Sequence, residues 1–265
     1  MTTPDSLLLS SRDGAVLRLV LNRARARNAL SSALMGELGA ALDAAAADRD
    51  VRVIVLAAEG PVFSAGHDLK ELQGHRADGD KGRAAYAGLF AQCSALMLKI
   101  VHCPKPVIAE VAGLATAAGC QLVASCDLVV ASDHAGFATP GVDIGLFCST
   151  PMVALSRAIG SKPAMEMLLT GEPIKAEAAK ALGLVNRVVP LAELQRETMA
   201  LAQKIATKPH GTIKTGKAAF YRQREMSLEA AYDYTAKVMT ENMLAAEASE
   251  GVCAFIEKRD PKWPQ

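Results

Sequence analysis

The chain of 265 residues has little charge imbalance and few aromatic side chains. It carries 29 Lys and Arg against 28 Asp and Glu, so the basic excess of a nucleic-acid-binding protein is missing. Only 4% of the residues are aromatic, so Ala, Val, Leu and Ile must fill the core. No apolar run approaches the roughly 18 residues that a membrane span requires. We therefore expect neither a nucleic acid nor a membrane as a partner.

The start of the chain also lacks a recognisable leader. Residues 1–6 show neither the basic segment of a secretory signal nor the arginine-rich character of a mitochondrial presequence. The six cysteines form no C-x-x-C pair and show no His/Cys spacing that suits zinc. Free cysteines of this kind are typical of reducing compartments. A cytoplasmic protein without a bound metal is the expectation.

Two common catalytic motifs are absent as well. The segment 211–217 has the spacing of a phosphate-binding P-loop, but Ala218 stands where the magnesium-binding hydroxyl belongs. No buried strand precedes this segment, and no G-x-S-x-G nucleophile elbow occurs anywhere in the chain. Nucleotide hydrolysis is therefore not expected.

What the sequence does contain is an alternation of strand-like and helix-like patterns up to about residue 131. Asp13-Gly14 separates two apolar segments and predicts a hairpin, and Leu34, Leu38 and Leu42 recur at helical spacing. This alternation predicts βαβ units and a largely parallel sheet, followed by mainly helical structure after Pro151. The expected strands are 7–10, 15–21, 51–56, 106–112 and 127–131, with helices over 84–100 and 117–125 between them. After Pro151 the clearest helices are 193–206 and 228–250.

Two loops of very small residues, Phe63–Leu69 and Ala115–Gln121, follow predicted strands. Small residues let a backbone approach a ligand closely. Ala118 stands at the start of a predicted helix, where N–H groups lack partners and the helix dipole favours negative charge. Together the loops can aim two N–H groups at one oxygen and hold a carbonyl while it gains negative charge.

Nine short segments in order along the chain form a recognisable set: Leu21–Arg23, Phe63–Leu69, Lys105–Ala109, Gly119–Leu122, Cys126–Leu128, Phe137–Pro140, Thr170–Glu172, Ala181–Asn186 and Glu257–Arg259. Through them the chain resembles, from about Val16 to Trp263, the crotonase (enoyl-CoA hydratase/isomerase) superfamily. Within it, the chain resembles the enoyl-CoA hydratase domain-containing subgroup that lacks the catalytic glutamates.

The resemblance implies an α/β fold with a ββα spiral core in residues 1–200. A C-terminal helical region, residues 201–265, would belong to the same functional unit and drive assembly into a homotrimer or a dimer of trimers. The implied ligand is a coenzyme A thioester, bound as a substrate, without a permanently bound cofactor.

The resemblance also implies roles for individual residues. The backbone N–H groups of His67 and Ala118 would form the oxyanion hole. Phe255 and Lys258 would reach the nucleotide of coenzyme A from the C-terminal helices, either of the same subunit or of a neighbouring one. The full set of candidate coenzyme A contacts is Arg23, Arg25, Ala65, Leu69, Lys70, Phe255 and Lys258.

The departures from the superfamily pattern concern the acid/base groups. Hydratases of this family use two glutamates to poise a water molecule, and this chain has Gln121 and Gly141 at those positions. A glutamine cannot accept a proton at neutral pH, and a glycine offers no side chain. Gly141 follows Pro140, so we expect a positive φ at Gly141 that would disfavour a glutamate.

Other titratable groups near these positions are the His67 imidazole, Asp143 and Cys148, whereas Ser149 replaces the aspartate of a dienoyl isomerase. The expected function is that of an enoyl-CoA hydratase/isomerase-like enzyme that polarises a thioester carbonyl but hydrates inefficiently. Two alternatives stay open: another thioester-enolate reaction such as acyl-CoA decarboxylation, and a non-catalytic acyl-CoA-binding protein.

Overall fold

A six-stranded sheet forms the centre of the fold, in a computed structural model that describes residues 6–264. The strand order is β1-β2-β3-β5-β7-β10. The predicted hairpin is confirmed, since β1 and β2 pair antiparallel from Asp13 with Val16 to Leu8 with Leu21. All other neighbours in this sheet run parallel. The strands are β1 (Leu8–Asp13), β2 (Val16–Leu21), β3 (Val53–Ala58), β5 (Val107–Val111), β7 (Leu128–Ser132) and β10 (Arg187–Val189).

A second, smaller sheet has the strand order β4-β6-β8-β9. The chain places one strand in the large sheet, the next in the small sheet, and then forms a helix, as in β3-β4-α3 and β5-β6-α4. This repeated ββα turn is the spiral that the resemblance implied. The short strands are β4 (Val62–Ser64), β6 (Leu114–Thr116), β8 (Gly136–Ala138) and β9 (Ile174–Lys175).

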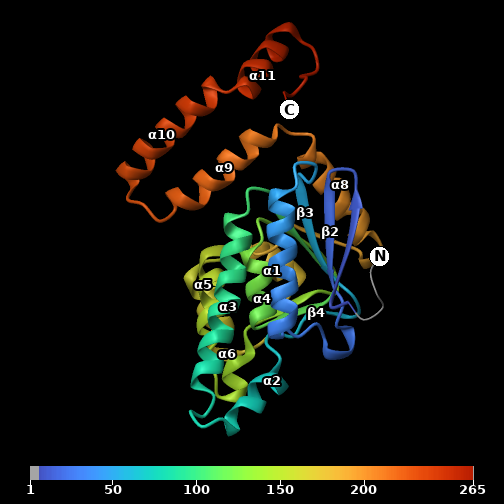
Figure 1. Cartoon of the computed structure of the whole chain (residues 1–265), viewed down its shortest axis with the longest axis vertical. Coiled ribbons are helices and arrows are strands. Elements are labelled where there is room, and N and C mark those ends of the chain that lie inside the picture. Colours follow the sequence, from blue (N-terminus) through green and yellow to red (C-terminus); the bar gives the residue numbers. More distant parts are fainter. Residues whose placement is uncertain (1–5, 265) are drawn as a thin grey trace.

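Helices cover both faces of the large sheet (Figure 1). On one face, α1 (Ser32–Ala47), α3 (Arg83–His102) and α4 (Ala118–Ser125) pack over the main core, in which Leu34, Leu38 and Leu42 are buried as predicted. On the other face, Leu194 and Ala202 of α8 (Leu194–Ala206) pack against Val53 and Val55. The Ser31 hydroxyl caps α1 by accepting a hydrogen bond from the Leu34 amide at 3.3 Å.

The prediction that no apolar run approaches the length of a membrane span was wrong. Between Ala84 and Val101 the only charged residue is Lys99, and α3 is long and apolar enough to cross a membrane by length and composition. The core helix of a folded domain meets the same criteria. Here α3 buries Leu89, Leu96 and other apolar side chains in the main core, whereas Phe90 and Leu98 are exposed.

The expected boundary between the spiral core and the C-terminal region, at residues 200 and 201, falls inside α8. Residues along the whole of that helix pack on the sheet. Beyond it, α9 (His210–Gln223) lies over the end of the body, to which it is tied by the Lys217–Asp127 pair, and α10 (Leu228–Leu244) and α11 (Ala246–Glu257) extend away from the body (Figure 1). The single helix predicted over 228–250 is interrupted at Ala245, whose backbone is extended. Residues 1–5, on which the expectation of no leader rests, lie outside the described part of the chain.

Because the chain changes direction at Ala245, the start of α11 lies against the start of α9. The Glu247 carboxylate accepts hydrogen bonds from the amides of Gly211 and Thr212, at 2.9 and 2.7 Å, and from the Thr212 hydroxyl. These are the amides that a phosphate would need in a P-loop. The segment 211–217 is therefore part of a helix whose anion position is filled by the protein's own side chain.

The remaining helices connect the strands at the edges of the two sheets. Among them, α2 follows the first small-residue loop, and η3 and α5 follow β8. Their bounds are α2 (Leu69–Gly74), α5 (Ser149–Ala158), α6 (Ser161–Thr170) and α7 (Ala176–Leu182), with 3-10 turns η1 (Ala24–Ala26), η2 (His75–Ala77), η3 (Pro140–Ile144) and η4 (Leu191–Glu193).

Candidate active site

The two small-residue loops lie against each other. Gly66 has a φ of +85°, and a Cβ atom built on it would lie 2.9 Å from the Ala117 Cβ and 3.1 Å from the Ala118 nitrogen. Ala117, at the start of α4, also has a positive φ of 50°. A non-glycine residue in this region is strained, and such strain is common where a backbone is held for function. The close approach therefore requires glycine at position 66.

Two backbone N–H groups remain without a partner at this junction. In the parallel bridge between Leu30 and His67, the Leu30 amide donates to the Gly66 carbonyl at 2.7 Å and the Asp68 amide donates to Leu30. Within residues 6–264, no acceptor contacts the amide of His67 or that of Ala118. Ala118 is the first residue of α4, where an amide has no carbonyl one turn earlier. Both amides can therefore donate to a ligand.

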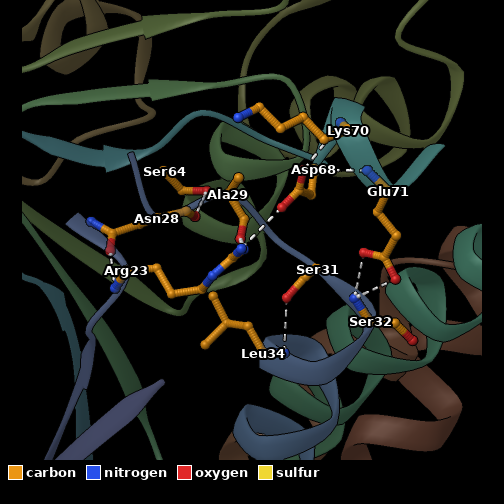
Figure 2. A network of polar contacts seen from close by, with 10 residues as sticks. All are labelled: Arg23, Asn28, Ala29, Ser31, Ser32, Leu34, Ser64, Asp68, Lys70 and Glu71. Atoms are coloured by element: carbon orange, nitrogen blue, oxygen red, sulfur yellow. Dashed lines mark hydrogen bonds and ion pairs between the residues drawn. The ribbon is translucent and has the colours of Figure 1, made fainter. Parts of the chain in front are cut away.

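A polar network holds the first loop in place (Figure 2). The Arg23 guanidinium pairs with the Asp68 carboxylate at 3.0 Å and donates to the Ala29 carbonyl at 2.5 Å. The Asn28 amide group donates to the backbone of strand β4 and of the turn before it, and the Ser64 hydroxyl donates to the Asn28 carbonyl at 2.8 Å. The segment after β2 is thereby fixed to the loop that contains His67.

Asp68 also caps α2, because its Oδ1 accepts hydrogen bonds from the amides of Lys70 and Glu71. Partial burial alone would raise the pKa of Asp68, but the Arg23 hydrogen bond and the two amides outweigh it and lower that pKa. The sequence contained a signal for this role, since an aspartate followed three residues later by a glutamate is typical of a helix start. The sequence analysis did not identify this cap or the role of Asn28.

We expect Arg23→Ala to lower the free energy of unfolding by about 1–3 kcal/mol, because it leaves a mostly buried carboxylate without its partner. Arg12→Ala, which breaks the exposed pair with Asp48, is a matched control and should cost less than about 0.5 kcal/mol. Urea unfolding of each variant measures the difference. Equal costs for the two variants would contradict a structural role for Arg23.

The pH dependence of stability tests the same pair. A lowered pKa in the folded state means that Asp68 stabilises the protein at neutral pH and loses this effect as the pH falls through its folded pKa, below the usual carboxyl range near 4. The stability difference between the wild type and Asp68→Asn should therefore be constant from pH 7 to 5 and shrink below about pH 4. A difference that stays unchanged down to pH 2 would contradict the assignment.

The His67 imidazole faces α3, where it packs edge-on against Phe90 with ring centroids 5.4 Å apart. Both ring nitrogens are buried and have no hydrogen-bond partner in the described part of the chain. Burial lowers the pKa of His67, although the nearby Leu30 backbone and the Glu71 charge oppose this. The ring is therefore neutral at pH 7, and its position beside Phe90 agrees with a role for the backbone of residue 67.

Gln121 lies one turn after Ala118 on α4, and its side chain is buried. The Cys93 thiol approaches its Oε1 atom, with 3.9 Å between sulfur and oxygen. Burial raises the pKa of Cys93 to about 11, so this group stays a thiol at neutral pH. The position of the first hydratase glutamate thus holds an amide beside a protonated thiol.

The position of the second hydratase glutamate, Gly141, has no room for a side chain. Gly141 does not have a positive φ, so the expected reason for a glycine there was wrong. A Cβ atom built on Gly141 would instead lie 2.5 Å from the Leu146 carbonyl oxygen and 2.9 Å from the Cys148 sulfur. No side chain fits without moving the backbone, because the segment after η3 fills the space that a glutamate would need.

The other titratable candidates differ in their surroundings. Cys148 is buried at the start of α5, and its burial raises its thiol pKa. The Asp143 carboxylate is directed at Gly171, at the end of α6, with its Oδ2 3.0 Å from where a Cβ of that glycine would be. Ser149 is exposed and its hydroxyl donates to the Phe147 carbonyl at 3.4 Å.

The candidate coenzyme A contacts divide into three groups. Arg23 is engaged with Asp68, whereas Arg25 and Lys70 are exposed and make no ion pair in the described part of the chain. Ala65 and Leu69 flank the His67 loop, and the Leu69 side chain is 53% exposed. Phe255 and Lys258 lie at the end of α11, at the opposite end of the molecule from α2 (Figure 1). They do not reach the site of their own chain.

The ββα spiral is the architecture of the crotonase superfamily, which establishes the class of the fold. Residues 11–265 match the family described as enoyl-CoA hydratase/isomerase, and the chain belongs to that family. A crystal structure of enoyl-CoA hydratase from Mycobacterium smegmatis superposes with a TM-score of 0.93 at 52% identity, covering 98% of this chain and 99% of that one.

The chain is also similar to enoyl-CoA hydratase domain-containing protein 3 of Homo sapiens, named as mitochondrial, with 50% identity over 94% of this chain and 80% of the human protein. The crystal structure of human enoyl coenzyme A hydratase domain-containing protein 3 superposes with a TM-score of 0.92 at 48% identity, covering 97% of this chain and 100% of that one. A probable enoyl-CoA hydratase of Rhizobium meliloti is 35% identical over 95% of both proteins. The expected subgroup is confirmed, and a cytoplasmic location of this chain stays a prediction.

Proposed function

We propose that this chain binds coenzyme A thioesters and holds the thioester carbonyl oxygen between the N–H groups of His67 and Ala118. The observation that carries the proposal is the contact between the two loops, which leaves both amides without an internal acceptor. Two fixed donors stabilise the negative charge that develops on a carbonyl oxygen during enolate formation. The start of α4 adds a favourable dipole at the same place.

The exposed cations near the loop supply the second part of the proposal. Arg25 on η1, Arg27 after it and Lys70 on α2 are exposed and form no ion pairs within residues 6–264. Positive charge at this rim suits the phosphates of coenzyme A. In this proposal coenzyme A arrives with the substrate and leaves with the product, and no permanently bound cofactor takes part.

The reaction follows from the groups beside the amides. Enoyl-CoA hydratase/isomerase-like chemistry needs the polarised carbonyl, but neither Gln121 nor the closed position at Gly141 can remove a proton from water. Hydration should therefore be slow. The closed position favours a reaction that needs no activated water, such as decarboxylation of a carboxyacyl thioester.

In that reaction the bond between Cα and the carboxylate carbon breaks and CO₂ leaves. The electron pair forms an enolate, whose oxygen the amides of His67 and Ala118 stabilise, and Cα then takes a proton from solvent. A protein that binds acyl-CoA without turnover is the outcome that would exclude both reactions.

Calorimetric titration with acetyl-CoA and crotonyl-CoA tests the binding proposal. We expect heat of binding that weakens as the salt concentration rises, because exposed charges are screened. Arg25→Ala and Lys70→Ala should each weaken binding about threefold, as expected for the loss of one exposed charge. Arg49→Ala, an exposed arginine on the segment after α1, is the control and should have no effect. Absence of heat at millimolar ligand would refute the proposal.

Assembly into a trimer or a dimer of trimers is a further part of the proposal. The C-terminal helices expose large apolar side chains that include Tyr232, Met239 and Met243, at 71%, 66% and 60%. Apolar surface of this extent is typical of an interface between subunits. Light scattering should give a trimeric or hexameric mass, and Met239→Glu with Met243→Glu should shift it towards the monomer. A monomeric wild type at micromolar concentration would contradict this prediction.

A further inference from the structure

One face of α11 is occupied by contacts within its own chain, although this helix lies in an arm that extends from the body (Figure 1). Ala254 on this face is only 1% exposed, and a Cβ atom built on Gly251 would lie 3.3 Å from the Trp263 ring. Residues three, four and seven positions apart share one side of a helix. The residues of this face have that spacing and are Glu247, Glu250, Gly251 and Ala254.

The first of these contacts joins the Glu247 carboxylate to the start of α9. The amides of Gly211 and Thr212 and the Thr212 hydroxyl donate to it at 2.9, 2.7 and 2.9 Å. Partial burial alone would raise the pKa of Glu247, but these hydrogen bonds outweigh it and lower that pKa. Burial and the Lys105 charge lower the pKa of His210, the first residue of α9, whereas the Glu247 charge raises it. Glu247 is therefore a carboxylate at neutral pH, bound by three donors.

The second contact is made by the residues after α11, which turn back along the helix. The Arg259 guanidinium and the Lys262 amide both donate to the Glu250 carboxylate, at 2.7 and 2.6 Å. The Trp263 indole N–H then donates to the Thr207 carbonyl at 3.0 Å, just before α9 begins. Helix α11 is thus bound on both sides of the turn between α8 and α9. We call the contacts of Glu247 and Trp263 together the clasp.

The clasp fixes the rotation of α11 about its own axis. At about 3.6 residues per turn, Val252, Phe255 and Ile256 point away from the face that Glu247 and Ala254 share. These three side chains are 42%, 85% and 72% exposed. The clasp therefore turns large apolar side chains of α11 away from the body, in the same arm whose α10 exposes Met239 and other apolar side chains.

A second copy of the chain is the partner that suits this surface. Large exposed apolar surfaces on soluble proteins are usually covered by a partner. The body of the same chain does not cover the arm, because the arm extends away from it (Figure 1). The net charge of the chain is only +1, so two copies repel each other little.

We propose that Glu247 is a positioning residue for assembly, which acts through the clasp by turning Val252, Phe255 and Ile256 towards a second copy of the chain. The inference rests on the assembly proposed above and adds the residue that controls it. The extended backbone at Ala245 interrupts the arm between α10 and α11. Without the clasp, α11 can rotate at this break and its apolar face is no longer held outward, so association weakens.

Glu247→Gln tests the clasp, because it removes the charge and turns an N–H group towards the donors of α9. We expect the dissociation constant of the assembly, measured by light scattering over a dilution series, to rise at least about tenfold. Thr212→Val removes only the hydroxyl donor and should give a smaller rise, about threefold. Glu241→Gln on α10 is the matched control, since Glu241 is exposed and forms no ion pair within residues 6–264, and it should have no effect.

The fluorescence of Trp263 reports the clasp independently of the mass, because the chain has a single tryptophan. In Glu247→Gln we expect emission at longer wavelength and stronger quenching by iodide, since the ring loses its contacts with Gly251 and Thr207. Both changes should be absent in Glu241→Gln. Neither measurement involves a thioester, so their outcome is independent of the ligand-binding proposal.

Each outcome decides between the two proposals. A monomeric wild type at micromolar concentration would overturn both the assembly and the role of Glu247. An assembled wild type in which Glu247→Gln changes neither the dissociation constant nor the tryptophan emission would overturn the role of Glu247 alone. A shifted emission with an unchanged dissociation constant would show that a released α11 still assembles, and an equal weakening by Glu241→Gln would show that charge alone matters. Either result would also overturn the inference.

Discussion

Wild-type protein should hydrate crotonyl-CoA at a rate close to the background, and Gln121→Glu should raise that rate about 10- to 100-fold. A single positioned acid or base contributes roughly 10²–10⁴-fold, and a lone glutamate without its partner should give at most the lower limit of this range. The substitution is nearly isosteric. Residue 121 is only 4% exposed, so burial should raise the pKa of the new carboxyl. Loss of the enoyl-thioester absorbance measures the rate.

The second glutamate should not be restorable by a single substitution. Gly141→Glu places its Cβ within 2.5 Å of the Leu146 carbonyl oxygen, so we expect this variant and the double variant to unfold at lower temperature and to gain no activity. Gly145→Ala is a control for a neighbouring glycine that has open space, although its φ of +76° carries a modest strain of its own. Fast hydration by the wild type, or an active and stable double variant, would show that the chemistry has been misplaced.

Gly66→Val should abolish tight binding of acyl thioesters, with a loss of about 10²–10³-fold in affinity or turnover. Its φ of +85° is strained for a β-branched residue, and the new Cβ would lie 3.1 Å from the Ala118 nitrogen. The two loops must then separate, so the two amides no longer converge, and losing one such donor typically costs about 3 kcal/mol. Titration with acetyl-CoA and with free coenzyme A measures the effect on the thioester separately from the nucleotide.

Gly74→Ala is the matched control for this experiment. Gly74 ends α2, close in sequence to the same loop, has an ordinary φ and has open space around its Cβ position. Its substitution should leave binding unchanged. Equal binding by Gly66→Val and Gly74→Ala, with both proteins folded, would contradict the assigned oxyanion hole.

The sequence predicts those features that depend on local pattern. Alternating apolar segments identify the strands of the large sheet, and the small residues from Phe63 to Leu69 and from Ala115 to Gln121 identify the two loops that meet. The ββα spiral itself came from the resemblance to a family, because periodicity does not specify which strand joins which sheet.

Features that depend on distant contacts could not be predicted from the sequence. Arg23 was expected to contact the nucleotide of coenzyme A. In the fold it binds the Asp68 carboxylate, which lies 45 residues later in the sequence. The reason for Gly141 lies in the return of the chain at Leu146, and the break at Ala245 depends on the contact of Glu247 with the start of α9. The clasp joins segments that lie far apart in the sequence, so no single segment carries a signal for it.

The carbonyl stretching frequency of a bound thioester tests the central claim most directly. Acetyl-CoA labelled with carbon-13 at its carbonyl, bound to the wild type, isolates this one vibration by difference infrared spectroscopy. Two amides donating to the oxygen weaken the carbonyl bond, so we predict a frequency clearly below that of the same thioester in water, and a loss of this shift in Gly66→Val. A bound thioester that absorbs at or above its frequency in water would show that the amides of His67 and Ala118 do not polarise it.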